Sequence, residues 1–220
     1  MDVLLVGTAD DPATTALAEH GDVRTAPAGP DATAAELDAV LSTMDARRLV
    51  VAGDLAWLNK VVGRLARRGL LADTPVGAIV TDPEWTVAMG LPADPAAAAR
   101  VAATGTPTPR GLIRDDHGGV VLGRAELSPW AGGTFGVRAY VDDTELVNEP
   151  VTRLRVTPGD GQLGARVERR GLRRGRGLTG RALTVSCAQA RLVVDGAASN
   201  RPQIRRTWWY EPDRWRLIAS

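Results

Sequence analysis

The sequence predicts an α/β N-terminal domain with a parallel sheet, followed by a C-terminal antiparallel β domain. Three observations support this fold class. Short apolar runs alternate with helical segments through the first half, two prolines interrupt residues 106–111, and a period-two pattern with many glycines follows. Alternating strands and helices form parallel sheets, whereas period-two patterns are typical of antiparallel strands. We expect residues 106–111 to form a linker or crossover.

Each element of the first half has a local signal. Residues 3–6 and 49–52 are short apolar runs, typical of buried parallel strands. Residues 31–44 place Leu37 and Leu41 on one face, which predicts a helix. Residues 55–68 are apolar on one side and arginine-rich on the other, and Gly69 ends this predicted helix. The other predicted elements are helices at 12–20 and 95–104 and strands at 22–25 and 76–80.

The second half contains a series of short strand candidates. Its last two, 205–210 and 215–218, flank Glu211, Pro212, Asp213 and Arg214, and these residue types favour a turn. We therefore expect a C-terminal hairpin rich in tryptophan. The remaining strand candidates are 120–122, 134–141, 153–157, 163–167, 183–187 and 191–194.

Composition limits the classes of function. The chain has 220 residues and a net charge of +1, which attracts neither nucleic acid nor membrane as a whole, so no nucleic acid partner is expected. Cys187 is the single cysteine, and His20 and His117 are the two histidines, so cysteine- or histidine-based metal sites are disfavoured. The chain starts without the basic segment of a signal peptide and has no apolar run near about 18 residues. We expect a cytoplasmic protein, with peripheral membrane association left open.

Several segments share their order and spacing with one known family. These are Leu58–Val62 in the predicted helix 55–68, residues 69–80 (GLLADTPVGAIV), residues 89–109, and residues 190–196 (ARLVVDG). Together they resemble the bacterial diacylglycerol kinase and lipid kinase family, which shares its fold with NAD kinases. The resemblance implies a nucleotide-binding domain at 1–108 and a β-rich domain at 109–220. It also implies ATP and magnesium as cofactors, and phosphorylation of a lipid hydroxyl between the two domains.

The resemblance also implies the site residues. Gly53, Asp54 and Asn59 would line the nucleotide, and Asp195 would face the acceptor hydroxyl. The family's first phosphate loop is Gly-Gly-Asp-Gly-Thr, whereas residues 53–57 are Gly-Asp-Leu-Ala-Trp, so only Gly53 keeps its place. Asp54 either replaces the family's acid after a one-residue slip or caps the following helix, and capping is the favoured interpretation.

Two further family elements are altered. The second phosphate loop, Gly-Thr-Gly-Asn-Asp in the family, is replaced by residues 81–86, TDPEWT. Asp82 before Pro83 predicts a helix cap, although a magnesium ion held by Asp82 or Glu84 is an alternative. The family's Asp-Gly-Glu is Asp195, Gly196 and Ala197, without the final acid. Three altered elements predict lost or much reduced phosphotransfer.

Other features offer alternatives to catalysis. A non-catalytic protein would bind a lipid or protein partner through the expected cleft between the two domains, the segment Arg166–Arg181, or the C-terminal hairpin. The hairpin could also form a homodimer contact. The segment Arg166–Arg181 would suit anionic lipid headgroups, or it is a solvated loop. Asp142, Asp143 and Glu145 could hold a cation, but an acidic turn is the favoured interpretation, and no metal site is predicted. The arginines of the segment are Arg166, Arg169, Arg170, Arg173, Arg174, Arg176 and Arg181.

Overall fold

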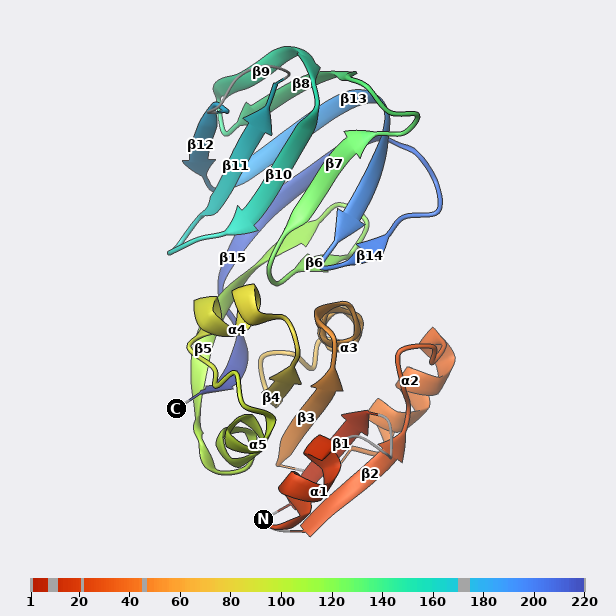
Figure 1. The fold of residues 1–220 in the computed structure, drawn as a ribbon, viewed down its shortest axis with the longest axis vertical. Coiled ribbons are helices and arrows are strands. Elements are labelled where there is room, and N and C mark those ends of the chain that lie inside the picture. Colours follow the sequence, from red (N-terminus) through yellow and green to blue (C-terminus); the bar gives the residue numbers. More distant parts are fainter. Residues whose placement is uncertain (1, 8–11, 21, 45–46, 170–174, 220) are drawn as a thin grey trace. The chain divides into compact units, whose positions relative to one another are not determined.

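The computed structural model describes residues 2–7, 12–20, 22–44, 47–169 and 175–219. Within them the chain forms two compact units (Figure 1). The first comprises Met1–Arg110 and Asp213–Ser220, and the second comprises Gly111–Pro212. Residues 213–220 thus belong to the first unit, whereas the expected ranges 1–108 and 109–220 assign them to the second.

The first unit contains a parallel sheet in the order β4-β3-β1-β2. Strands β1, β3 and β4 are buried on both faces, as their continuous apolar runs predict, whereas the edge strand β2 exposes Arg24 and Thr25. The α/β class with a parallel sheet is therefore confirmed for this part of the chain. The elements are β1 (Asp2–Gly7), α1 (Pro12–Ala18), β2 (Asp22–Pro27), α2 (Ala34–Ser42), β3 (Arg48–Gly53), α3 (Leu55–Arg67), β4 (Pro75–Val80), α4 (Pro83–Met89) and α5 (Pro95–Thr104).

Helix α5 packs very closely on the sheet. A Cβ atom at Gly77 of β4 would lie 2.7 Å from the Cβ of Ala102 of α5. Only glycine fits there, and the alanine-rich face of α5 lets the helix approach. Ala99 and Ala103 of α5 join Leu17 of α1 in one buried cluster with the strands, and Figure 1 shows α1 and α5 as neighbours.

Helix α2 begins later than the sequence predicts. Thr33 is its N-cap, and Thr33 and Glu36 form a reciprocal capping box, so the helix starts at Ala34 rather than at residue 31. On its exposed side, Asp38 accepts hydrogen bonds from the Arg64 guanidinium of α3, and Arg68 Nη1 lies 3.2 Å from Asp38 Oδ1. These side-chain contacts join α2 to α3.

The second unit is built from antiparallel strands around one buried cluster that includes Trp208, so the antiparallel C-terminal prediction is confirmed. The long strand β13 pairs with β8 over its first part and with β7 over its second part. The strands are β5 (Thr106–Asp115), β6 (Val120–Val121), β7 (Ala125–Pro129), β8 (Phe135–Val141), β9 (Thr144–Val151), β10 (Arg153–Pro158), β11 (Leu163–Glu168), β12 (Gly177–Gly180), β13 (Ala182–Val194), β14 (Ala197–Ala198) and β15 (Gln203–Ala219).

A buried ion pair holds the turn after β5 against β15. Arg206 Nη1 lies 3.1 Å from Asp115 Oδ2, and both side chains are 7% exposed. The other oxygen of Asp115 accepts the backbone N–H groups of His117, at 2.9 Å, and Gly119, at 2.7 Å. The two charges therefore meet each other and the backbone rather than water, which is the condition for a buried pair to persist.

Two sequence predictions about connections need correction. Residues 106–111 begin strand β5, which pairs with β15 and β6, so they are not an irregular linker. The boundary between the two units falls after Arg110, which agrees with the alternative prediction of a crossover. Residues 205–218 do not form a hairpin, because they belong to the single strand β15. Its first part pairs with β13 and its last part, at Arg216 and Leu217, pairs with β4. Each part pairs with a different strand, so residues 211–214 continue β15 instead of forming a hairpin turn, and the left-handed φ of 50° at Asp213 interrupts the extended backbone.

The contact between Asp38 and Arg64 makes stability depend on pH. The Arg64 guanidinium, followed by Arg68, lowers the pKa of Asp38 from 3.8 to about 2. A carboxylate whose pKa falls on folding stabilises the protein above its unfolded pKa, and this stabilisation is lost as the pH falls towards the folded value.

Asp38→Asn should therefore lower the urea midpoint slightly at pH 7, and the difference from wild type should shrink between pH 4 and pH 2. Urea unfolding followed by circular dichroism at several pH values measures it. Asp73→Asn, at an exposed position, is the control and should leave the pH profile unchanged. An Asp38→Asn difference that is equal at pH 7 and pH 2 would contradict this assignment.

Candidate functional site

The connection from β3 to α3 is where the resemblance predicts a phosphate loop. Gly53 has a φ of 148°, which favours glycine, and Asp54 follows as the N-cap of α3. The Asp54 Oδ1 accepts the backbone N–H of Trp57 at 2.7 Å. The predicted cap is therefore confirmed, and it occupies a backbone donor at the helix N-terminus, where such donors commonly bind anions.

The side chain of Trp57 lies against this loop. It is 1% exposed, and its Nε1 donates to the backbone oxygen of Val6 at 3.4 Å. Its Cδ1 atom is 3.0 Å from the position that a Cβ on Gly53 would take. Lys60 Nζ lies 5.8 Å from the centre of the ring, a cation–π distance. The indole thus covers the one glycine that the loop retains.

The connection from β4 to α4 repeats this arrangement. Asp82 caps α4 through the backbone N–H of Trp85, at 2.9 Å, and Pro83 takes the first helical position, as predicted. Trp85 is 3% exposed. The two loops are joined by a hydrogen bond from the Thr81 N–H to the Gly53 oxygen at 3.2 Å. Both helices therefore begin with Asp-x-x-Trp, a capping carboxylate followed by a buried indole.

The structure brings three of the four predicted site residues into one region. Gly53 and Asp54 form the loop before α3, and Asn59 is half-buried in the second turn of that helix. Asp195 lies in the second unit. The sequence pattern did not single out the repeat of Asp-x-x-Trp, although Asp54, Trp57, Asp82 and Trp85 make it visible in the sequence.

Asp195 is held by backbone groups. It is 3% exposed and has a φ of 49°, and with Gly196 it forms the turn between β13 and β14. Its carboxylate accepts the backbone N–H groups of Leu122 at 2.8 Å, Gly123 at 2.9 Å and Arg124 at 2.7 Å. This carboxylate fixes the loop between β6 and β7. Its long-range partners, more than 70 residues away, left no signal in the local sequence.

Removing this carboxylate should destabilise the second unit. Asp195→Ala leaves three largely buried N–H groups without their acceptor, which should cost about 3 kcal/mol of unfolding free energy. Urea unfolding measures this loss. Asp160→Ala, at an exposed loop position, is the control and should change the unfolding free energy by less than about 0.5 kcal/mol. Equal stabilities of the two variants would contradict the structural role of Asp195.

The acidic segment at residues 142–145 is a turn. Asp142 and Asp143 connect β8 to β9, and Asp142 Oδ1 accepts the backbone N–H of Ala182 at 2.9 Å. Its two oxygens also accept the N–H of Arg181 at 3.1 Å. Among the described residues, no group of three or more His, Cys, Asp or Glu side chains is arranged to hold a metal ion.

The segment Arg166–Arg181 is only partly described. Arg166 lies on β11 and Arg181 precedes β13, and both are exposed, as is Arg176. Arg169 forms an ion pair with Glu149 of β9. Arg170, Arg173 and Arg174 lie outside the described residues. No helix of the described chain is long and apolar enough to cross a membrane.

Comparisons with known proteins define the fold. No family model matches the sequence, and no curated protein matches it. Solved structures do match. A diacylglycerol kinase from Bacillus anthracis str. Sterne superposes with a TM-score of 0.77 at 12% identity, over 100% of this chain and 97% of that chain. Yeast NADH kinase complexed with NADH superposes with a TM-score of 0.61 at 10% identity, over 100% of this chain and 84% of that one.

The chain therefore has the fold of the diacylglycerol kinases and NAD kinases, as the sequence resemblance implied. At these identities the match concerns the fold, and the chemistry has to be argued from the residues of this chain.

Proposed function

We propose that this protein keeps a lipid kinase fold but has lost ATP-dependent phosphorylation of a lipid hydroxyl, and acts by binding. The observation that carries the proposal is the indole of Trp57 against Gly53. A phosphate loop works because glycines let backbone N–H groups approach the anion. Here the only retained glycine faces a buried aromatic ring.

The charges at the two loops support the same proposal. Asp54 and Asp82 place carboxylates at the N-termini of α3 and α4, where a triphosphate would need positive potential. At about 4 Å, one carboxylate repels one phosphate charge by about 1 kcal/mol in water and about 4 kcal/mol near a protein surface. The caps also occupy the N–H groups of Trp57 and Trp85. These residues do not fit a magnesium–triphosphate.

On the side of the lipid hydroxyl, residues 195–197, which correspond to the family's Asp-Gly-Glu, offer no free carboxylate. Asp195 is buried and bonded to three backbone donors, and Ala197 stands where the family has an acid. Deprotonating or orienting a hydroxyl needs a carboxylate within hydrogen-bond reach of it. If phosphotransfer persisted, Gly53, Asp54 and Asn59 would have to hold the nucleotide, and Asp195 would have to give up its backbone partners.

Calorimetry with magnesium–ATP tests the nucleotide side. We expect no binding tighter than a Kd of about 1 mM, because the Trp57 ring lies against Gly53 and the carboxylates of Asp54 and Asp82 cap the two helices. Asp54→Asn removes one charge and keeps the cap, so this variant should also fail to bind magnesium–ATP.

Trp57→Gly removes the indole from Gly53, and the loss of this buried side chain should lower the free energy of unfolding by about 4 kcal/mol. Trp57→Phe is the matched control that keeps most of the bulk.

Incubation with magnesium–ATP and diacylglycerol tests the chemistry directly. We expect no phosphorylated lipid above the level of a sample without protein. Micromolar ATP binding by the wild-type chain, or lipid phosphorylation that Asp195→Ala abolishes in a folded sample, would overturn the proposal.

A second candidate function is association with an anionic lipid surface through the segment Arg166–Arg181. It is favoured by the exposure of Arg166, Arg176 and Arg181. The homodimer contact that the C-terminal aromatic residues could form stays a prediction, although these residues lie on the single strand β15 and not on a hairpin. Trp208 and Trp215 are buried, and Trp209 donates from its Nε1 to Glu211 Oε1 at 3.0 Å.

A further inference from the structure

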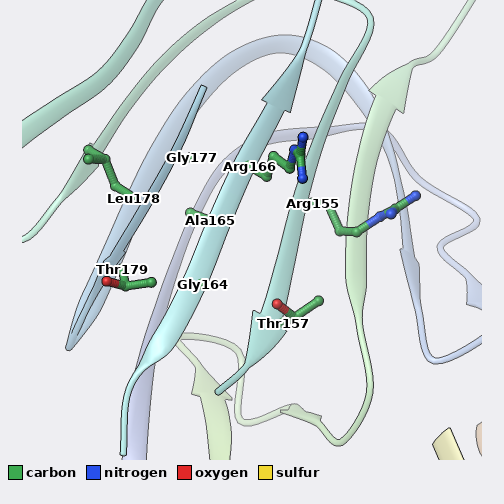
Figure 2. Close-up of a pocket in the computed structure, with 8 residues that line it drawn as sticks. All are labelled: Arg155, Thr157, Gly164, Ala165, Arg166, Gly177, Leu178 and Thr179. Atoms are coloured by element: carbon green, nitrogen blue, oxygen red, sulfur yellow. The ribbon is translucent and has the colours of Figure 1, made fainter. Parts of the chain in front are cut away.

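The outer face of strands β10, β11 and β12 contains an open hollow of about 570 Å³ (Figure 2). These strands belong to the second unit, far along the chain from the loops before α3 and α4. On the opposite face, Leu154, Val156 and Val167 enter the core. The side chains that face outward in the hollow are therefore not needed for packing. They include Arg155, Thr157, Arg166 and Thr179.

Two arginines stand directly opposite each other in this hollow. Arg155 of β10 pairs in register with Arg166 of β11, and Figure 2 shows both side chains on the neighbouring strands. Like charges at opposite positions of an antiparallel pair destabilise the sheet. Arg155 is also directly opposite Glu126 of β7, and Figure 2 shows its side chain directed away from Arg166, so the uncompensated charge lies mainly on Arg166.

Acidic neighbours compensate only part of this charge. Glu126 lies 3.4 Å from Arg155 Nη2, but it is nearer to Arg153, whose Nε is 3.0 Å away. Arg166 has no acidic partner among the described residues, and its side chain is exposed. The hollow therefore carries net positive charge that an anion would neutralise.

Two glycines keep the hollow open. Gly177 of β12 is opposite Arg166, and Gly164 of β11 is opposite both Thr157 and Thr179. Neither glycine is in the left-handed region, and a Cβ at Gly177 would meet only ordinary contacts, the nearest being the Ala165 oxygen at 3.5 Å. Glycine inside a strand weakens it, so its presence without a packing reason points to a close approach from outside.

We propose that this hollow binds a phosphate monoester group. The exposed guanidinium of Arg166 and the hydroxyls of Thr157 and Thr179 can donate to the three terminal oxygens of a phosphate, and Arg155 would add a second guanidinium by leaving Glu126. The site goes beyond the proposed function, because it involves neither the loop at Gly53 nor Asp195. The group would come either from a soluble metabolite or from a lipid headgroup, since the chemistry of recognition is the same.

Titration of the full chain with inorganic phosphate and with glycerol phosphate tests the site by calorimetry and by NMR shifts. We expect saturable binding that Arg166→Gln weakens about tenfold, since it removes a charge-assisted hydrogen bond. Gly177→Val should also weaken it, because it fills the hollow without removing charge. Arg205→Gln, at an exposed position of β15, is the matched control and should change the affinity less than twofold.

Vesicles distinguish the two sources. Binding to vesicles that carry a phosphate monoester lipid, with the same response to Arg166→Gln and Gly177→Val, would support the site and assign it to a lipid headgroup. Equal binding to vesicles of any anionic lipid, unaffected by Gly177→Val, would overturn the proposal in favour of general charge attraction. Phosphate binding that Arg166→Gln leaves unchanged in a folded variant would also overturn it. The hollow shares no residue with the loop at Gly53, so the outcome of the phosphate titration does not depend on whether the protein binds magnesium–ATP.

Discussion

The contact between the Trp57 indole and Gly53 is the interaction on which our proposal for the first unit depends. Gly53 supplies the sharp bend between β3 and α3, and the ring closes the space above it. Losing a buried tryptophan costs about 3 to 5 kcal/mol, which corresponds to about two to nearly four powers of ten in an equilibrium constant. An anion that had to displace this ring would first lose that stabilising free energy, and its own contacts would have to exceed the loss.

A common role connects the aspartates of the two units. Asp54, Asp82 and Asp94 cap helices by accepting the N–H three residues further on. Asp115, Asp142 and Asp195 accept backbone N–H groups in the turns of the second unit. From the sequence, a catalytic or metal-binding role is an alternative for Asp54, Asp82, Asp142 and Asp195, although a cap or a turn is the favoured interpretation for the first three. Their partners show that these carboxylates satisfy backbone donors, which would otherwise lose hydrogen bonds on folding.

The arginines of the second unit differ in whether an acidic side chain matches their charge. Arg206 is buried against Asp115, where its charge is matched. Arg155 and Arg166 instead share a surface hollow with small and hydroxylated residues. The fold thus pairs its buried charge, whereas on the outer sheet face Glu126 compensates Arg155 only in part and Arg166 has no acidic partner among the described residues.

The sequence by itself determined the alternation of strands and helices, the caps at Asp54 and Asp82, and the turn at Asp195 and Gly196, because each depends on neighbours within a few residues. It also carried enough ordered similarity to indicate the fold. It could not determine the course of residues 205–218, where turn-favouring residues lie inside β15, since the partners of that strand come from β13 and β4. The tertiary structure alone placed Arg155 opposite Arg166 and the Leu122 N–H on Asp195, because strand register and long-range contacts are set by packing.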